Sequence, residues 1–127
     1  MQTDNSLINY LYETIIGRAF TVSKGLGSGC LEKIHENALV HELRNAGLAV
    51  TQQHRIIVLH DGIAIDTYTA DVFVENTVLV ELKVVKTLDT LHGAQCLNYL
   101  KATGLRLCLL LNFGNPRLEI RRLLNAP

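Results

Sequence analysis

The chain has 127 residues, of which 48% are hydrophobic and 19% are charged, and its formal net charge is zero. This composition excludes an intrinsically disordered chain, and the length suits a single domain spanning residues 1–127. Because the charges balance, attraction to nucleic acid would have to come from a local patch rather than from the whole molecule.

The cysteines and the hydropathy predict a cytoplasmic protein. Cys30, Cys96 and Cys108 are odd in number and widely spaced, which is typical of free thiols in a reducing compartment. They form no Cys-x-x-Cys pair, so a structural zinc site is not expected. The N-terminus lacks a secretory pattern, and no apolar run approaches the ~20 residues that a membrane span needs.

Two amphipathic helices are expected at the start of the chain. In the first, residues 5–24, apolar side chains recur at helical spacing up to the glycine-rich segment 25–29. The second is predicted over residues 29–46, with Ser28 as its N-cap and Gly47 as its stop.

One stripe of the second helix is apolar along its length and polar at its first turn. Glu32 and His35 form that polar end, so both are expected at the end of the fold where a site would lie. By position alone, Glu32 also fits the ordinary role of a first-turn acid stabilised by the helix dipole. The stripe comprises Glu32, His35, Leu39, Leu43 and Ala46.

A hairpin is predicted next. Residues 50–59 and 63–71 read as strands, and Asp61-Gly62 between two apolar runs is a strong turn signal. Asp66 and Asp71 are five residues apart on the second strand. They should therefore point to opposite faces, with Asp66 in solvent.

The stretch 71–83 carries the main signal for a site. It reads as two strands around a turn at residues 75–77, with Asp71 on the first strand and Glu81 and Lys83 on the second. Only an odd-length loop places Asp71 beside Glu81 or Lys83 on one face of the sheet. Two carboxylates brought together in this way form a site for a hard cation, with a lysine beside it. The same register gathers the even-numbered apolar residues on the other face: Ala70, Val72, Val74, Val78, Val80, Leu82 and Val84.

The last elements are a helix over residues 89–103 and strands over 105–113 and 118–124. Asp89 is a suitable N-cap, and Gly104 a suitable stop. Gln95 lies on an otherwise apolar stripe of this helix and is either a site residue or a structural one, since a buried amide needs a partner. That stripe comprises Leu88, Leu91, Gln95, Tyr99 and Ala102. The element order α-α-β-β-β-α-β-β predicts an α/β fold with one mixed sheet between helices.

Several segments resemble a known family. Asp71, nine residues and then Glu81-Leu82-Lys83 resemble the signature of the PD-(D/E)XK nuclease superfamily. The segment 29–35, Gly-Cys-Leu-Glu-Lys-Ile-His, is similar to the Gly-x-x-Glu-x-x-Tyr motif of the GxxExxY family within that superfamily, with His35 in place of the motif Tyr. Segments 94–100 and 111–114 also resemble this family, and the resemblance spans about residues 11–124.

This resemblance implies a restriction-endonuclease-like fold and a metal-dependent nuclease acting on DNA or RNA. Its metal, Mg²⁺ or Mn²⁺, would be held by Asp71, Glu81 and the backbone carbonyl of Leu82. Lys83 would orient the attacking water or stabilise the phosphate. Glu32 and Gln95 would complete the catalytic set. Basic side chains that could contact phosphates are Lys86, Lys101, Arg106, Arg117, Arg121 and Arg122.

Other interpretations remain open. Asp71, Glu81 and Lys83 could form a buried ion pair, which would stabilise the fold little once desolvation is counted. The protein could also be a non-catalytic module that binds nucleic acid or protein, or a structural protein that forms a homodimer. All three members of the Asp71, Glu81 and Lys83 set are present, which favours catalysis over a retired enzyme.

Overall fold

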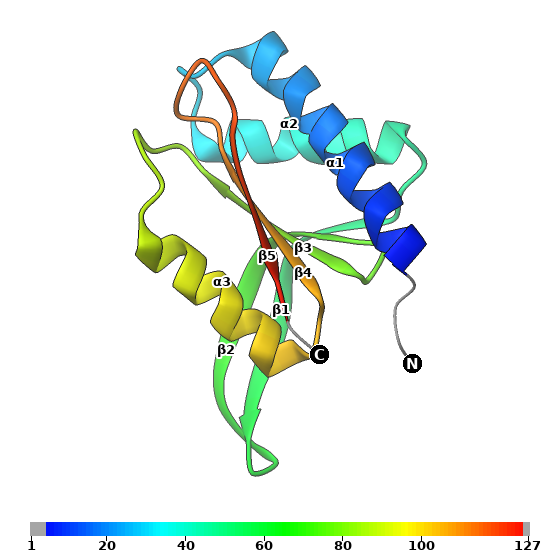
Figure 1. Cartoon of the computed structure of the whole chain (residues 1–127), viewed down its shortest axis with the longest axis vertical. Coiled ribbons are helices and arrows are strands. Elements are labelled where there is room, and N and C mark those ends of the chain that lie inside the picture. The colour runs from blue at the N-terminus through cyan, green and yellow to red at the C-terminus, as the bar shows by residue number, and fades with distance from the viewer. Residues whose placement is uncertain (1–4, 126–127) are drawn as a thin grey trace.

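A five-stranded mixed sheet separates two helices on one side from a single helix on the other in the computed structural model, which describes residues 5–125 (Figure 1). The sequence prediction of an α/β fold with this element order is confirmed. The helices are α1 (Asn5–Leu26), α2 (Glu32–Asn45) and α3 (Thr90–Thr103). The strands are β1 (Val50–His60), β2 (Ile63–Val74), β3 (Val78–Lys83), β4 (Leu107–Asn112) and β5 (Glu119–Leu124).

The strand order in the sheet is β1-β2-β3-β4-β5. All neighbouring pairs are antiparallel except β3 and β4, which run parallel. Parallel neighbours need a crossover connection, and α3 supplies it. The chain leaves β3 at Lys83 and enters α3 at Thr90, after the connection 84–89, and Lys83 and His92 of α3 line the same pocket.

The sheet has an apolar core on each face. On one face, valines and leucines of the strands pack against α1 and α2 in a cluster that includes Val72, Val80, Leu82, Leu11 and Leu39. On the other face, Phe73, Leu79, Leu110 and Cys108 of the strands pack with Cys96 and Leu100 of α3. Both faces of the central strands are therefore buried, as expected for a sheet covered by helices.

The odd-length loop predicted for the β2–β3 hairpin is confirmed, and of the two registers that the sequence left open the structure has the one with the three-residue loop. Val74 pairs with Val78 and Val72 pairs with Val80 across the three-residue loop 75–77. Val72, Val74, Val78, Val80 and Leu82 all join the α1–α2 cluster, as the alternation predicted.

Ala70 departs from this pattern, because it packs in the cluster beneath α3. The reason lies next to it. Pairing between β1 and β2 is interrupted at Gln53 and Asp71, and Gln53 has a φ of 51°. The strands are distorted there, so the strict alternation of faces that the prediction assumed does not extend past Asp71.

The start of the second helix was predicted wrongly. It begins at Glu32 rather than near Gly29, and Leu31 occupies the N-cap position without a side-chain cap, so Ser28 does not cap it. The ring Nε2 of buried His35 lies 2.9 Å from the carbonyl oxygen of Gly27, a contact that ties the preceding turn to the helix. The sequence pattern does not contain this contact eight residues apart.

The helix over residues 89–103 was predicted well. Asp89 is the N-cap, and its side chain accepts from the backbone N–H of His92. Gly104 ends the helix in the left-handed conformation with φ 74°. The buried side of α3 is nevertheless formed by Gly93, Cys96 and Leu100. The stripe that carries Gln95 was therefore misassigned as a core face.

The hairpin of β1 and β2 extends away from the rest of the molecule (Figure 1). Its turn residues Asp61 and Gly62 have φ values of 50° and 76°, which fits the tight Asp-Gly turn predicted there. We call residues 57–66 the hairpin arm. Asp66 is exposed on it, as expected, and β2 runs without interruption from Ile63 to Val74. Within residues 5–125, no helix is both long enough and apolar enough to cross a membrane.

Candidate functional site

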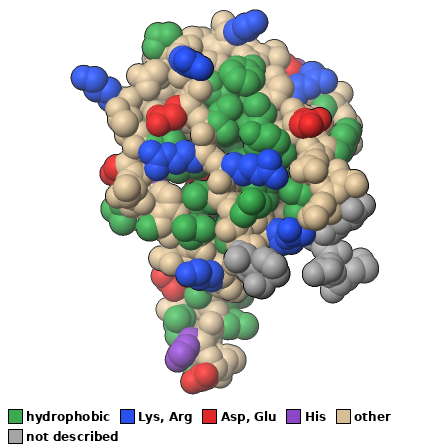
Figure 2. All heavy atoms as spheres, in the orientation of Figure 1, with side chains coloured by type: hydrophobic (Ala, Val, Ile, Leu, Met, Phe, Trp, Pro, Cys, Tyr) green, Lys and Arg blue, Asp and Glu red, His purple; other side chains and the backbone are tan. Residues whose placement is uncertain are grey.

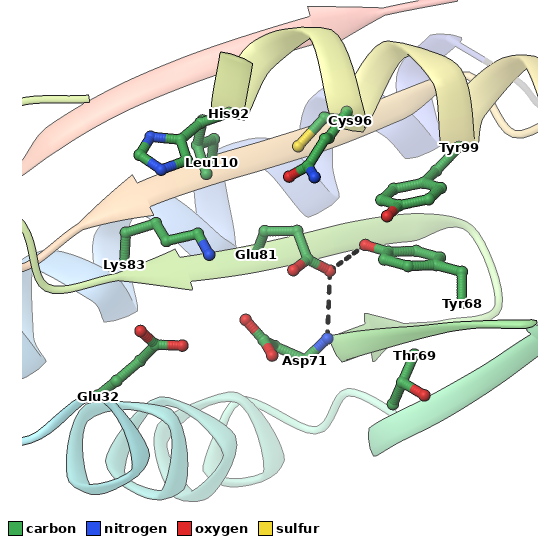
Figure 3. Close-up of a pocket in the computed structure, with 11 residues that line it drawn as sticks. Glu32, Tyr68, Thr69, Asp71, Glu81, Lys83, His92, Cys96, Tyr99 and Leu110 are labelled. Carbon is green, nitrogen blue, oxygen red and sulfur yellow. Dashed lines mark hydrogen bonds between the residues drawn. The ribbon is translucent and has the colours of Figure 1, made fainter. Parts of the chain in front are cut away.

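A polar pocket of about 320 Å³ opens between the start of α2, the middle of β2, the end of β3 and one side of α3 (Figure 3). Every side chain proposed as catalytic from the sequence lines it: Glu32, Asp71, Glu81, Lys83 and Gln95. These residues are up to 63 positions apart in the chain, and the fold brings them to one cavity. The remaining lining residues are Tyr68, Thr69, His92, Cys96, Tyr99 and Leu110.

The two acids meet where the β2–β3 ladder ends. The last residues paired by register are Val72 and Val80, so Asp71 and Glu81 are the next residues along each strand. Beyond that point the carboxylates satisfy backbone groups of the opposite strand. The N–H of Asp71 donates to Glu81 Oε1 over 3.2 Å, and the N–H of Leu82 donates to Asp71 Oδ2 over 2.9 Å. The strands therefore part at this point, and their acids face each other across the opening.

Glu81 is poorly solvated and lies next to another acid. Burial, and then the negative charge of Asp71, raise the pKa of Glu81 to about 8. Hydrogen bonds from the Tyr68 hydroxyl and the Asp71 N–H act in the opposite direction. Both bonds end on Oε1, so among the described residues none donates to Oε2 of this carboxylate. When both acids are ionised, the buried pair has a local excess of negative charge, which favours a bound cation.

Lys83 lies on the same pocket wall as Glu81, two residues further along β3 (Figure 3). Within residues 5–125 it forms no ion pair with a carboxylate. The alternative that these residues form a structural ion pair therefore has no contact in its favour. The Lys83 ammonium group is therefore available to a ligand in the pocket.

Glu32 stands on the solvent side of the pocket, at the first residue of α2. Its pKa is raised by partial burial and then by the charge of Asp71, while Lys83 lowers it. Glu32 and Asp71 therefore share one cavity and influence each other electrostatically, as the Gly-x-x-Glu resemblance led us to expect.

His35 faces away from the pocket, although it is one turn from Glu32. Its ring is completely buried, stacks on Phe113 with centroids 4.8 Å apart, and contacts the carbonyl oxygens of Gly27 and Leu31. Carbonyl oxygens only accept, so the ring nitrogen that carries the proton donates to Gly27 or to Leu31, depending on the tautomer, and both lie at the entry to α2. His35 therefore holds the start of α2, and through it Glu32, rather than taking part in the pocket.

One side of α3 forms the opposite wall. Gln95 is exposed and lines the pocket together with His92, Cys96 and Tyr99 of the same helix. The sequence named Gln95 but not the other three. Tyr99 was counted as a core residue because it falls on the stripe with Leu91, whereas Leu91 is itself 64% exposed.

Tyr68 is the most informative residue that sequence reasoning missed. It projects from β2 three residues before Asp71, stacks on Tyr99, and donates its hydroxyl proton to Glu81 Oε1. Burial and then the adjacent Glu81 charge raise the pKa of Tyr68, so it remains a donor. An isolated tyrosine in a strand is ordinarily a packing residue, and only the three-dimensional contact distinguishes this one.

The donor set fits a hard divalent cation. Asp71 and Glu81 offer carboxylate oxygens, which Mg²⁺ and Mn²⁺ prefer. A strand residue directs its N–H and C=O to the same edge, and the N–H of Leu82 points at Asp71, so its carbonyl lies on that edge too. Among the described residues, no group of three or more His, Cys, Asp or Glu could hold a metal ion. Two carboxylates and a carbonyl are therefore the protein ligands that the pocket offers, and water and phosphate oxygens would have to supply the rest.

The basic residues considered as phosphate contacts are scattered. Lys86 and Arg117 line a second cavity of about 330 Å³ between the loops that follow β3 and β4. Arg122 lies over the Tyr12 ring of α1, and Arg106 donates to Asn5. No single face collects all six. In one view of the surface, lysines and arginines are spread among hydrophobic and neutral side chains (Figure 2).

Residues 9–123 match the family model of the PD-(D/E)XK nuclease superfamily. Among solved structures, the chain is similar to an alkaline exonuclease (LHK-Exo) from Laribacter hongkongensis. The two are 17% identical, the match covers 99% of this chain and 73% of that one, and the TM-score is 0.46. No curated protein matches the chain.

Proposed function

The chain belongs to the PD-(D/E)XK nuclease superfamily, and from this we propose that it is a metal-dependent nuclease that hydrolyses phosphodiester bonds of DNA or RNA. The observation that carries the proposal is the meeting of Asp71 and Glu81 at the end of the β2–β3 ladder, with Lys83 in the same pocket. Superfamily membership alone would not be enough, because a fold does not guarantee its chemistry.

In the proposed reaction, Asp71, Glu81 and the Leu82 carbonyl would hold Mg²⁺ or Mn²⁺. When bound, the ion would supply positive charge for the scissile phosphate and for activation of a water. The Lys83 ammonium donates hydrogen bonds to that water or to the phosphate oxygens, which gain negative charge as the phosphorus–oxygen bond breaks. Glu32 acts through water from the rim, and Gln95 offers an amide from the opposite wall.

We also propose the finer assignment to the GxxExxY family. Its support is Glu32 in the pocket and the resemblance of segments 94–100 and 111–114 to that family. His35 departs from the motif tyrosine, but its burial away from the pocket makes this a change in the scaffold rather than in the chemistry.

A non-catalytic module that binds nucleic acid or protein is the second candidate. The zero net charge and the scattered arginines and lysines favour its protein-binding form, because they provide no extended basic surface for tight binding of nucleic acid. The comparisons give no support to the homodimer that the sequence left open. A cytoplasmic location remains our proposal, supported by three cysteines that form no disulfide.

The test is a cleavage assay on single- and double-stranded DNA and RNA with Mg²⁺, with Mn²⁺, and with chelator alone. The proposal expects cleavage of at least one substrate that requires the metal and is lost in Asp71→Ala. Asp66→Ala is the matched control, since Asp66 lies on the same strand in solvent. Binding without cleavage by the wild-type protein would favour the second candidate.

A further inference from the structure

The pairing of β1 with β2 is broken directly opposite the proposed metal ligand. The register pairs Gln52 with Val72 and His54 with Ala70, but Gln53 and Asp71 between them are unpaired. The residue pairs before and after this gap share one register, so neither strand has an inserted residue there. The break is therefore a local distortion at these two residues rather than a slip of the strands.

Gln53 has a strained backbone. Its φ of 51° lies in the left-handed region that non-glycine residues rarely adopt. The other described non-glycine residues with positive φ, Asp61, Glu75 and Asn76, lie in hairpin turns, where such values are ordinary. A single residue of this kind costs roughly 1–3 kcal/mol and persists only where its surroundings enforce it. Something specific must therefore hold Gln53.

The side-chain contacts of Gln53 show what holds it. Its amide Nε2 donates to Glu36 Oε1 over 2.9 Å and to Asp71 Oδ1 over a longer 3.4 Å. Glu36 is 2% exposed, and its other oxygen accepts from Lys33 and from Gln52. The buried Glu36 carboxylate thus accepts three hydrogen bonds and holds the Gln53 amide in place. The same amide also donates to Asp71.

Asp71 is fixed from both sides by this arrangement. The N–H of Leu82 holds Oδ2 from β3, and the Gln53 amide holds Oδ1 from β1. A carboxylate that must bind an ion gains affinity when its orientation is set in advance, because less freedom is lost on binding.

We propose that Gln53 is a positioning residue that orients the carboxylate of Asp71, with the buried Glu36 as its anchor. This inference deepens the proposed function and rests on it, since it treats Asp71 as a metal ligand. Nothing in the sequence pattern marks Gln53, which lies on a strand next to an identical residue, Gln52.

Two variants separate positioning from stability. Gln53→Gly removes the amide and relieves the positive φ, which stabilises the fold, but it also removes the described donor to Oε1 of buried Glu36, which destabilises it, so the two effects offset each other in part. Gln52→Ala is the matched control, because Gln52 also donates to Glu36, over 2.7 Å, while its other bond goes to Asn37 and not to Asp71. We expect Gln53→Gly to weaken Mn²⁺ binding by about 10-fold or more, as losing a partner behind a metal ligand commonly does. We expect Gln52→Ala to bind Mn²⁺ as the wild type does.

Mn²⁺ calorimetry and thermal unfolding of both variants provide the measurements, together with a metal-free crystal structure of Gln53→Gly. In that structure the Asp71 carboxylate should rotate or adopt several conformers. An Asp71 carboxylate left in place, or Mn²⁺ affinity unchanged in Gln53→Gly, would overturn the positioning role. Wild-type protein that binds Mn²⁺ but cleaves no nucleic acid would instead overturn the proposed function alone. If the wild type binds no Mn²⁺, the metal-free structure still decides whether Gln53 orients Asp71.

Discussion

At the scale of single residues, Glu81 shows how the proposed function conflicts with stability. Its pKa of about 8 means that the folded, metal-free protein keeps a proton which an unfolded glutamate releases near pH 4.5. Between these two values the folded state binds more protons than the unfolded state, so stability falls as the pH rises. The fall is complete once the pH exceeds about 8. It amounts to roughly 3–5 kcal/mol if the whole shift is expressed.

Glu81→Gln should remove this pH dependence, because an amide does not ionise. We expect the variant to be more stable than the wild type at pH 8.5 in the presence of chelator, and similar to it near pH 4.5. Urea unfolding at several pH values, with EDTA present, measures the difference. Parallel pH profiles for the two proteins would show that Glu81 is not the buried acid described above.

Lys83 should matter to cleavage and little to metal binding. It is placed to act on water or phosphate, and none of the described carboxylates pairs with it. We expect Lys83→Ala to lower kcat by about 100-fold or more, the loss typical when one stabilising donor is removed. Its Mn²⁺ affinity should stay close to that of the wild type.

Calorimetry and single-turnover cleavage distinguish these effects. Lys24→Ala serves as the control, since Lys24 is an exposed lysine in the last turn of α1 and does not line the pocket. A Lys83→Ala protein that cuts at the wild-type rate would show that the lysine is structural.

At the scale of elements, some parts were predictable because their causes are local. The odd length of the β2–β3 loop followed from alternation alone, and the ends of α3 followed from Asp89 and Gly104, because capping residues act within one turn. The start of α2 was not predictable, since it depends on the contact between the His35 ring and the Gly27 carbonyl, eight residues earlier. Tyr68 and Gln53 were missed for the same reason.

The segment after β4 illustrates a tertiary constraint that can be tested. The buried Asn112 amide bonds both the N–H and the carbonyl of Val85, and the Phe113 N–H donates to the carbonyl of Lys83 over 2.8 Å. A Cβ at Gly114 would collide with the Val85 backbone, with its nitrogen only 2.6 Å away. The end of β4 is therefore held against the backbone that follows Lys83, and this contact leaves no room for a side chain at Gly114.

We expect Gly114→Ala to destabilise the fold by about 2 kcal/mol or more, as forced overpacking does. Gly17→Ala is a control of opposite sign, because Gly17 is an exposed position in α1 with open space around it. That change should stabilise by about 0.5–1 kcal/mol through helix propensity. Denaturant unfolding of both variants measures the two effects. A Gly114→Ala protein as stable as the wild type would show that Gly114 is not tightly packed against Val85.

At the scale of the whole molecule, the pocket exists because the helical layers on the two faces of the sheet meet at one end of β3. Glu32 comes from the layer on one face, and His92, Gln95 and Tyr99 come from the helix on the other. The sequence could identify the residues of a single hairpin, but not which helices would close over them. Superfamily resemblance supplied Glu32 and Gln95, whereas the amphipathic pattern of α3 pointed to the wrong face.

The hairpin arm lies outside this arrangement, and its removal separates what the fold needs from what the site needs. Its large apolar residues Ile57, Leu59, Ile63 and Ile65 are 60–65% exposed, so they bury little surface against the rest of the chain. Ile57 pairs with Thr67, and both Gln53 and Tyr68 lie on the side of this pair nearer the body. Replacing residues 58–66 by Asn-Gly therefore joins two paired strand residues through a turn that suits a hairpin.

We expect the shortened protein to keep its Tm within about 4 °C of the wild type, since about 1 kcal/mol or less is at stake. Its Mn²⁺ affinity should not change, because every residue that lines the pocket or orients Asp71 is retained. Thermal unfolding and calorimetry on the shortened chain provide the comparison. A large fall in Tm that depends on protein concentration would instead show that the arm is buried between two copies of the chain. A loss of Mn²⁺ binding at unchanged Tm would show that strain in the distant hairpin reaches Asp71 through β2.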